Sequence, residues 1–153
     1  PLSREHHDGL LFVWKIRQGL DNRVSTDQLK QYTGWYWRNH IKPHFFQEEK
    51  VLLPLIDGAN PMAVRLKKEH DCIRELILTI DREADLQDFK RLANLIETHI
   101  RFEEREFFKH LEENLSAEQL KRVQEQLETS PLLCDAEWKD EFWVKKTETK
   151  QSK

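Results

Sequence analysis

Two short patterns rich in histidine and glutamate each occur twice in this chain. A Leu-x-x-Glu-His segment is followed further along by a helical His-x-x-x-Glu segment, and the whole order then repeats. Residues four apart lie one turn apart on the same helix face, so each His-x-x-x-Glu pair presents a nitrogen and an oxygen to one point. The duplication therefore predicts four imidazoles and two carboxylates, the ligand set for a pair of metal ions. The candidate ligands are His6, His44, Glu48, His70, His99 and Glu103.

The spacing of apolar residues is that of an α-helix almost throughout. Four glycines and five prolines leave little material for the turns of an all-β fold. Long helices joined by short loops are typical of an up-down-up-down four-helix bundle. The sequence therefore predicts an all-α fold with such a bundle, a short fifth helix and a C-terminal tail. The expected helices cover residues 3–18, 25–57, 60–83, 85–113 and 116–128.

Local signals set the expected helix boundaries. A Ser, Thr, Asp or Asn before a helix accepts hydrogen bonds from its first backbone N–H groups, and Gly often follows its last residue. Gly19 is expected to stop the first helix. Pro43 is expected to kink the second helix, because proline lacks a backbone N–H. N-terminal caps are expected at Ser3, Ser25, Asn60 and Ser116.

Composition excludes several classes of protein. The 25 basic and 28 acidic residues give a net charge of −3 without a basic stripe, so nucleic acid is not an expected partner. No apolar stretch approaches the ~20 residues that cross a bilayer, and residues 1–20 show no signal peptide. Two cysteines are too few for a disulfide framework, which favours a cytoplasmic protein. We expect Cys72 to be a small buried residue rather than a redox thiol.

The chain divides at about residue 128. Residues 1–128 contain both copies of the repeated pattern and form the expected metal-binding domain, while residues 129–153 form an extension. The extension is expected to be partly helical, with a polar and disordered end. Its apolar stripe needs a surface to cover, either the protein's own bundle or a second copy, so we expect a monomer or a homodimer. The residues of that stripe are Cys134, Trp138, Phe142 and Trp143.

His6 and His7 are adjacent, so only one of them can face a helical core. The stripe through His6 contains no other polar side chain, whereas the stripe through His7 is half polar. The stripe through His70 is likewise apolar, which pairs it with His6 as the metal-facing residue. Four residues remain candidates for an additional ligand: His7, His40, His110 and Tyr36.

Ligand chemistry restricts the metal. Imidazole and carboxylate suit iron, manganese or zinc, and so many nitrogens make calcium or magnesium a poor match. A glutamate can bridge two ions, so two glutamates favour a dinuclear centre. The sequence has no thiolate cluster for an iron–sulfur or structural zinc site. It also lacks the Glu-x-x-His pairs of ferritin-like bundles and the His-Glu-x-x-His of zinc proteases.

With these motifs the chain resembles the hemerythrin-like, or HHE cation-binding, family. The similarity covers about residues 1–128 and includes both His-x-x-x-Glu-Glu helices. It implies a four-helix bundle around two iron ions with carboxylate and oxo or hydroxo bridges. Oxygen-carrying members have a fifth histidine one turn after the one on the third helix, where this chain has Arg74. The ligands implied by the resemblance are His6, His44, Glu48, His70, His99 and Glu103, with Glu49 and Glu104 outside the ligand set.

The resemblance and the missing fifth histidine favour a non-haem di-iron protein that binds or senses O₂ or a related oxidant, such as peroxide or nitric oxide. Two histidines and two shared glutamates for each iron, with one bridging oxygen, leave a position open for such a ligand. One alternative is an enzyme, either a di-iron oxidase or peroxidase or a nitric-oxide-linked iron-repair protein, although we expect a binding protein. Another alternative is a metal-responsive interaction module.

Overall fold

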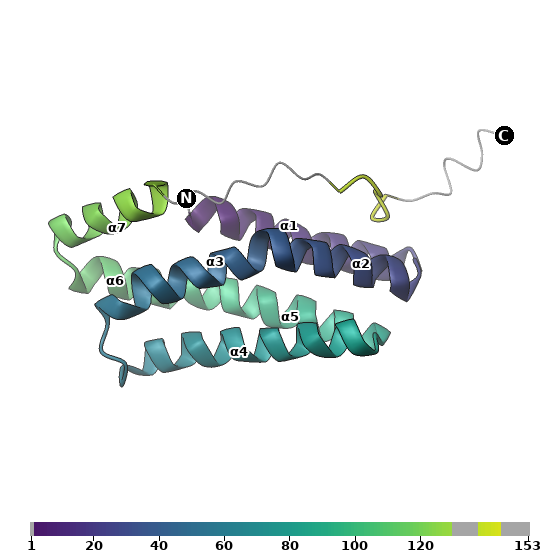
Figure 1. Ribbon diagram of the computed structural model, residues 1–153, viewed down its shortest axis with the longest axis horizontal. Helices are drawn as coiled ribbons and strands as arrows, with labels where there is room; N and C mark the ends of the chain where they lie inside the picture. The colour runs from purple at the N-terminus through teal and green to yellow at the C-terminus, as the bar shows by residue number, and fades with distance from the viewer. Residues whose placement is uncertain (1, 130–137, 145–153) are drawn as a thin grey trace.

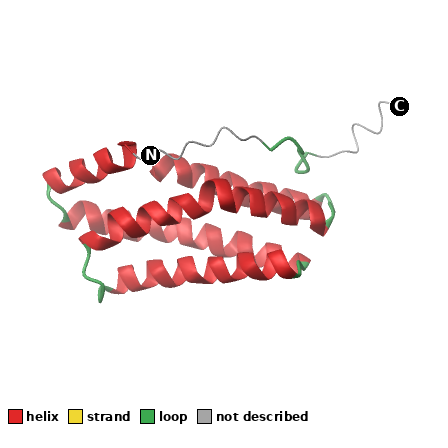
Figure 2. Ribbon diagram, in the orientation of Figure 1, coloured by secondary structure: helices red, strands yellow, loops and turns green. Residues whose placement is uncertain are grey.

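Four long helices dominate the molecule. The computed structural model describes residues 2–129 and 138–144, and every regular element in those ranges is helical. Successive long helices run in opposite directions and are joined by short loops (Figure 1; Figure 2). The predicted all-α, up-down-up-down bundle is therefore confirmed.

The elements have the following bounds. The first long helix is α1 (Leu2–Asp21) and the third is α4 (Pro61–Arg82). The second runs from α2 (Thr26–Tyr36) through η1 (Trp37–Ile41), α3 (Lys42–Gln47), η2 (Glu48–Leu52) and η3 (Leu53–Leu55). The fourth joins α5 (Leu86–Phe102), η4 (Glu103–Phe107) and α6 (Phe108–Asn114). The shorter α7 (Ala117–Thr129) lies outside the bundle, near the end that contains α6 (Figure 1).

Most of the predicted caps begin helices as expected. Ser25 and Ser116 each form a capping box, in which the serine accepts from a backbone N–H three residues on and a glutamine reaches back. Asn60 accepts a hydrogen bond of 2.9 Å from a backbone N–H two residues on. The exception is α1, which begins at Leu2, so Ser3 lies inside the helix and is not its cap.

The expected stop at Gly19 is wrong. Helix α1 continues to Asp21, and the chain reverses at Arg23, which has a positive φ of 57°. Gly19 instead permits a close approach, because a Cβ there would lie 2.7 Å from the Phe142 ring and 2.9 Å from Leu29. The missing side chain makes room for a residue more than a hundred positions away, which no local signal reveals.

Three π-helical turns widen the long helices. The turn η1 ends directly before α3, whose second residue is Pro43, so the helix accommodates the proline without ending there. The other two turns, η2 and η4, begin at Glu48 and Glu103. These are the glutamates of the two His-x-x-x-Glu segments, so the same local departure from α-helix recurs at the same place in the repeat. Such turns are frequent at functional sites.

Two hydrophobic clusters fill the bundle and leave an interval between them. The larger cluster includes Phe12 and Ile73, and the smaller includes Leu66 and Leu111. On α4, His70 lies between Leu66 of one cluster and Ile73 of the other. Burial of apolar surface on both sides stabilises the bundle and keeps water away from the polar residues in between.

The tail packs on the protein's own bundle over residues 138–144. Phe142 is completely buried, and its ring centre lies 5.0 Å from that of Tyr32. The segment is turned rather than helical, so the expected short helix is not formed there. Cys134, part of the same predicted stripe, lies outside the described residues, as do residues 145–153 with their expected disorder.

Cys72 lies on the outer face of α4. It follows His70 by two residues and therefore points away from the core. The prediction of a buried Cys72 is wrong, because its free thiol is exposed.

Candidate metal centre

Six buried polar side chains from all four long helices meet between the two hydrophobic clusters. Each of them is at most 7% exposed. Their nitrogen and oxygen atoms form two groups, and all atoms within a group lie within 4.8 Å of one another. One group is His6, His44, Glu48 and Glu103, and the other is Glu48, His70, His99 and Glu103. The structure thus brings together all six residues that the repeat singled out, and both glutamates belong to both groups.

Glu48 presents a different oxygen to each group. Its Oε2 lies 3.4 Å from Nε2 of His44 and 4.0 Å from Nε2 of His6. Its Oε1 lies 3.0 Å from Nε2 of His70. A carboxylate that offers one oxygen to each of two histidine pairs has the arrangement of a bridge between two cations.

Glu103 occupies the matching position on the fourth long helix. Its Oε1 lies 2.6 Å from Nε2 of His99 and 3.5 Å from Nε2 of His6. In the second group the Nε2 atoms of His70 and His99 are 3.1 Å apart. The ring nitrogens therefore converge on the same small volume as the carboxylate oxygens.

Several of these atoms are buried without a hydrogen bond. They include Nε2 of His6, Oε2 of Glu48 and both side-chain oxygens of Glu103. Burial of a carboxylate without a partner is costly, and such groups in proteins are normally paired or coordinate a metal. A cation at the point on which these atoms converge would satisfy them, so the residues present fit a metal centre.

The protonation states also suit a cation. Burial lowers the pKa of His6, with a further contribution from His44, and burial likewise lowers the pKa of His99. Burial alone would raise the pKa of Glu48, but contacts with His44 and His70 outweigh it and hold that pKa below its usual range. Neutral imidazole and ionised carboxylate are the forms that bind metal.

Three more glutamates, which we call the outer carboxylates, contact the other ring nitrogen of a site histidine. The Nδ1 to Oε distances are 2.7 Å for His70 with Glu49, 2.7 Å for His99 with Glu69 and 3.1 Å for His6 with Glu104. An Nδ1–H that donates to a carboxylate fixes the ring orientation and leaves the Nε2 lone pair directed at the centre. In this structure Glu49 and Glu104 therefore lie outside the two groups.

Two arginines hold two of the outer carboxylates. Arg74 lies 2.8 Å from Glu49, and Arg65 lies 2.9 Å from Glu69. Burial alone would raise the pKa of both glutamates. Hydrogen bonds from the site histidines and from these arginines outweigh this effect, so the pKa of each lies below its usual value. Arg74 thus positions a residue behind the centre.

The additional ligand candidates lie outside both groups. His7 is exposed, whereas its neighbour His6 is 2% exposed and faces the centre. His40 stacks on Tyr36 with ring centres 4.6 Å apart. His110 lies 3.3 Å from the side-chain amide of Asn60.

Sequence reasoning missed Glu69 and Arg65. Glu69 carried a usable signal, because it is the glutamate of the repeated Leu-x-x-Glu-His segment and directly precedes a site histidine. Arg65 had no comparable signal, since its role depends on the position that Glu69 takes up between helices.

The helical bundle and its two overlapping groups of buried histidines and glutamates are the features of a cation-binding helical protein. The family model of the hemerythrin HHE cation binding domain matches residues 2–111. That match spans more than half of the chain, which therefore belongs to the hemerythrin HHE cation-binding family. Comparison with curated proteins and with solved structures gave no match.

Among the described residues, none of the helices combines the length and the apolar character that a bilayer crossing requires.

Proposed function

We propose that this protein is a non-haem di-iron protein that binds or senses O₂ or a related oxidant. His6 and His44 would hold one ion, and His70 and His99 would hold the other. Glu48 and Glu103 would contribute to both. The observation that carries the proposal is that both glutamates belong to both histidine groups.

The surrounding residues prepare this centre. When bound, a pair of iron ions supplies the one-electron and oxidant chemistry that side chains alone lack. The outer carboxylates orient the imidazoles, and the two hydrophobic clusters exclude water. Binding or sensing is favoured over simple oxygen carriage, because Arg74 pairs with Glu49 at the position of a carrier's fifth histidine.

Metal analysis joined to optical spectroscopy tests the proposal. The full chain is loaded with iron(II) without oxygen, desalted, analysed for iron per chain, and then exposed to air, peroxide or nitric oxide in separate arms. We expect two irons per chain and, after oxidation, the near-ultraviolet absorption typical of a coupled ferric pair. Parallel loading with manganese and with zinc tests the choice of metal.

A matched pair of variants serves as the control. Glu103→Ala removes a shared carboxylate, whereas Glu112→Ala removes an exposed one on the same long helix. Only the first should lose iron. Fewer than one iron per chain in the unmodified protein, or iron binding that does not depend on Glu103, would overturn the assignment.

A further inference from the structure

A groove of about 910 Å³ lies between the second long helix and α4, apart from the six buried residues. Its walls come from η1, α3 and η2 on one side and from α4 on the other. Gln126 of α7 completes one end. Pockets of this size accommodate one small organic molecule.

The charged residues that line this groove are all basic. They are Arg38, Lys42, Lys50 and Arg74, and no aspartate or glutamate lines it. Arg74 is already paired with Glu49 at 2.8 Å and with Asp71 at 3.2 Å. In the part of the chain that the structure describes, the other three cations form no ion pair with a carboxylate.

The remainder of the lining is largely apolar. Phe46 and Leu78 are 60% and 62% exposed, and Trp37, Val51 and Ile77 lie beside them. Large apolar side chains that gather at one place on a surface, rather than singly, mark a binding site. The lining of the groove thus combines exposed apolar side chains with cations.

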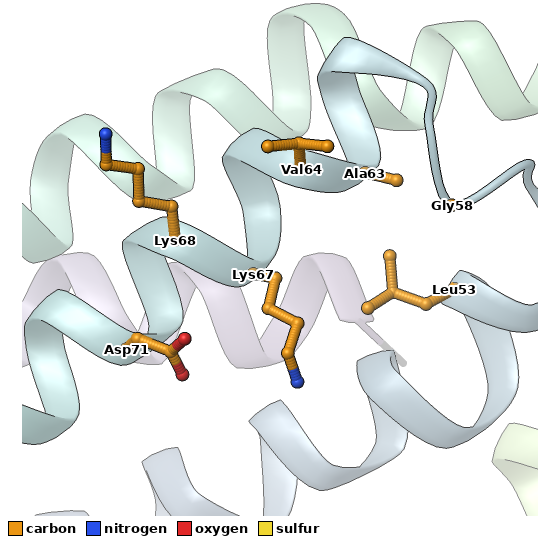
Figure 3. Close-up of a pocket in the computed structure, with 7 residues that line it drawn as sticks. All are labelled: Leu53, Gly58, Ala63, Val64, Lys67, Lys68 and Asp71. Carbon is orange, nitrogen blue, oxygen red and sulfur yellow. The ribbon is translucent and has the colours of Figure 1, made fainter.

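A second pocket beside the same helix differs from this groove in its lining. This pocket of about 380 Å³ is lined by Lys67 and Lys68, but also by Asp71 (Figure 3). Lys68 points away from the other lining residues in Figure 3. The positive charge of this pocket is partly balanced by Asp71, and its large apolar side chains are Leu53 and Val64.

We propose that the larger groove binds a small amphipathic anion, namely a carboxylate carried on an apolar chain or ring. Arg38, Lys42 and Lys50 attract the anionic end, although Lys50 also lies over the Phe46 ring at 5.8 Å. Phe46 and Leu78 cover the apolar part. A free small molecule is the expected occupant, because the volume suits one such ligand and the charge complements it. This groove contains none of the six residues of the metal centre, although Arg74 lines it and also holds Glu49, and the inference does not depend on the metal proposal.

Calorimetric titration of the full chain with octanoate tests this inference. We expect saturable binding of one octanoate per chain that weakens at high salt. Octanol removes the charge and butanoate removes most of the apolar chain, and each is expected to bind at least about fivefold more weakly.

Matched double variants locate the site. Lys42→Gln with Lys50→Gln is expected to weaken octanoate binding about fivefold, since each exposed charge contributes modestly. Leu78→Glu should weaken it at least as much. Lys67→Gln with Lys68→Gln removes the same charge at the smaller pocket and should leave the affinity unchanged. Circular dichroism of each variant confirms that the fold is retained.

Several results would overturn the inference. One is the absence of saturable octanoate binding at millimolar concentration, and another is equal binding of octanol. Equal affinity in the two double-lysine variants would show that the ligand lies elsewhere. Binding to anionic phospholipid vesicles without binding of octanoate would assign this face to a membrane surface instead.

Discussion

The two halves of the candidate centre come from one repeated pattern but receive different support. In the half formed by His70 and His99, each outer nitrogen contacts a glutamate that an arginine holds in place. In the other half, His6 contacts Glu104, whose side chain is 46% exposed and forms no ion pair with an arginine or lysine among the side chains described in residues 6–127 and 138–144. Glu49 is 19% exposed by comparison.

Aromatic packing differs in the same direction. The ring of Phe45 stacks on His70 at 3.7 Å between centres, while Phe108 stacks on His6 at 5.2 Å. A ring that is packed closely and bonded to a half-buried, paired carboxylate has little freedom to turn. We therefore expect the His70 and His99 half to hold its ion more firmly, so similar ligands do not imply equal sites.

The largest effect is expected from the residues that the halves share. Glu48→Ala and Glu103→Ala should each release most of the iron from both halves, because each carboxylate serves both groups. Iron per chain after desalting is the measurement. If either variant kept one firmly bound iron, the two halves would be independent rather than bridged.

The second-largest effect on iron affinity is expected from the outer carboxylates, and it should differ between the two halves. Glu49→Ala should lower iron affinity about 10- to 100-fold, as is typical for residues that orient a ligand. Glu104→Ala should lower it only a few-fold, since its contact with His6 is longer and more exposed. Competition with a chelator measures both affinities. Equal losses would remove the proposed difference between the halves.

A smaller effect is expected from the stacked rings. Phe45→Leu should destabilise the protein by about 1 to 2 kcal/mol, because it removes a buried ring from His70. Phe108→Leu, at a partly buried position, should cost about half as much or less. Thermal unfolding with and without iron gives both values, and a larger cost at Phe108 would reverse the comparison.

The smallest effect is expected from the arginines. Arg74→Gln and Arg65→Gln should each weaken iron binding about two- to fivefold, because they act through Glu49 and Glu69 in partly exposed ion pairs. Arg122→Gln, in an exposed pair on α7, is the control and should change nothing. Chelator competition again provides the measurement. If Arg74→Gln matched the loss for Glu49→Ala, the arginine would be essential to the position of Glu49.

Local features of the sequence predicted most of the framework. The capping boxes at Ser25 and Ser116 and the Asn60 cap lie where they were expected, since each depends on residues a few positions apart. Two predictions failed for different reasons. Gly19 lies inside α1, where its missing side chain leaves room for the distant Phe142, which no local signal reveals. Cys72 is exposed, although its position two residues after His70 already placed it on the outer face of α4.

By itself, the sequence determined that four helices present four histidines and two glutamates on their inner faces. Helical periodicity and four-residue spacing are properties of each segment alone. Only the tertiary structure decided that Glu48 and Glu103 are shared between two histidine pairs, and that Glu69 and Arg74 support one half. These relations depend on how closely the helices approach and which way side chains turn between them. Such distances are set by packing of the whole bundle and are not encoded in any one segment.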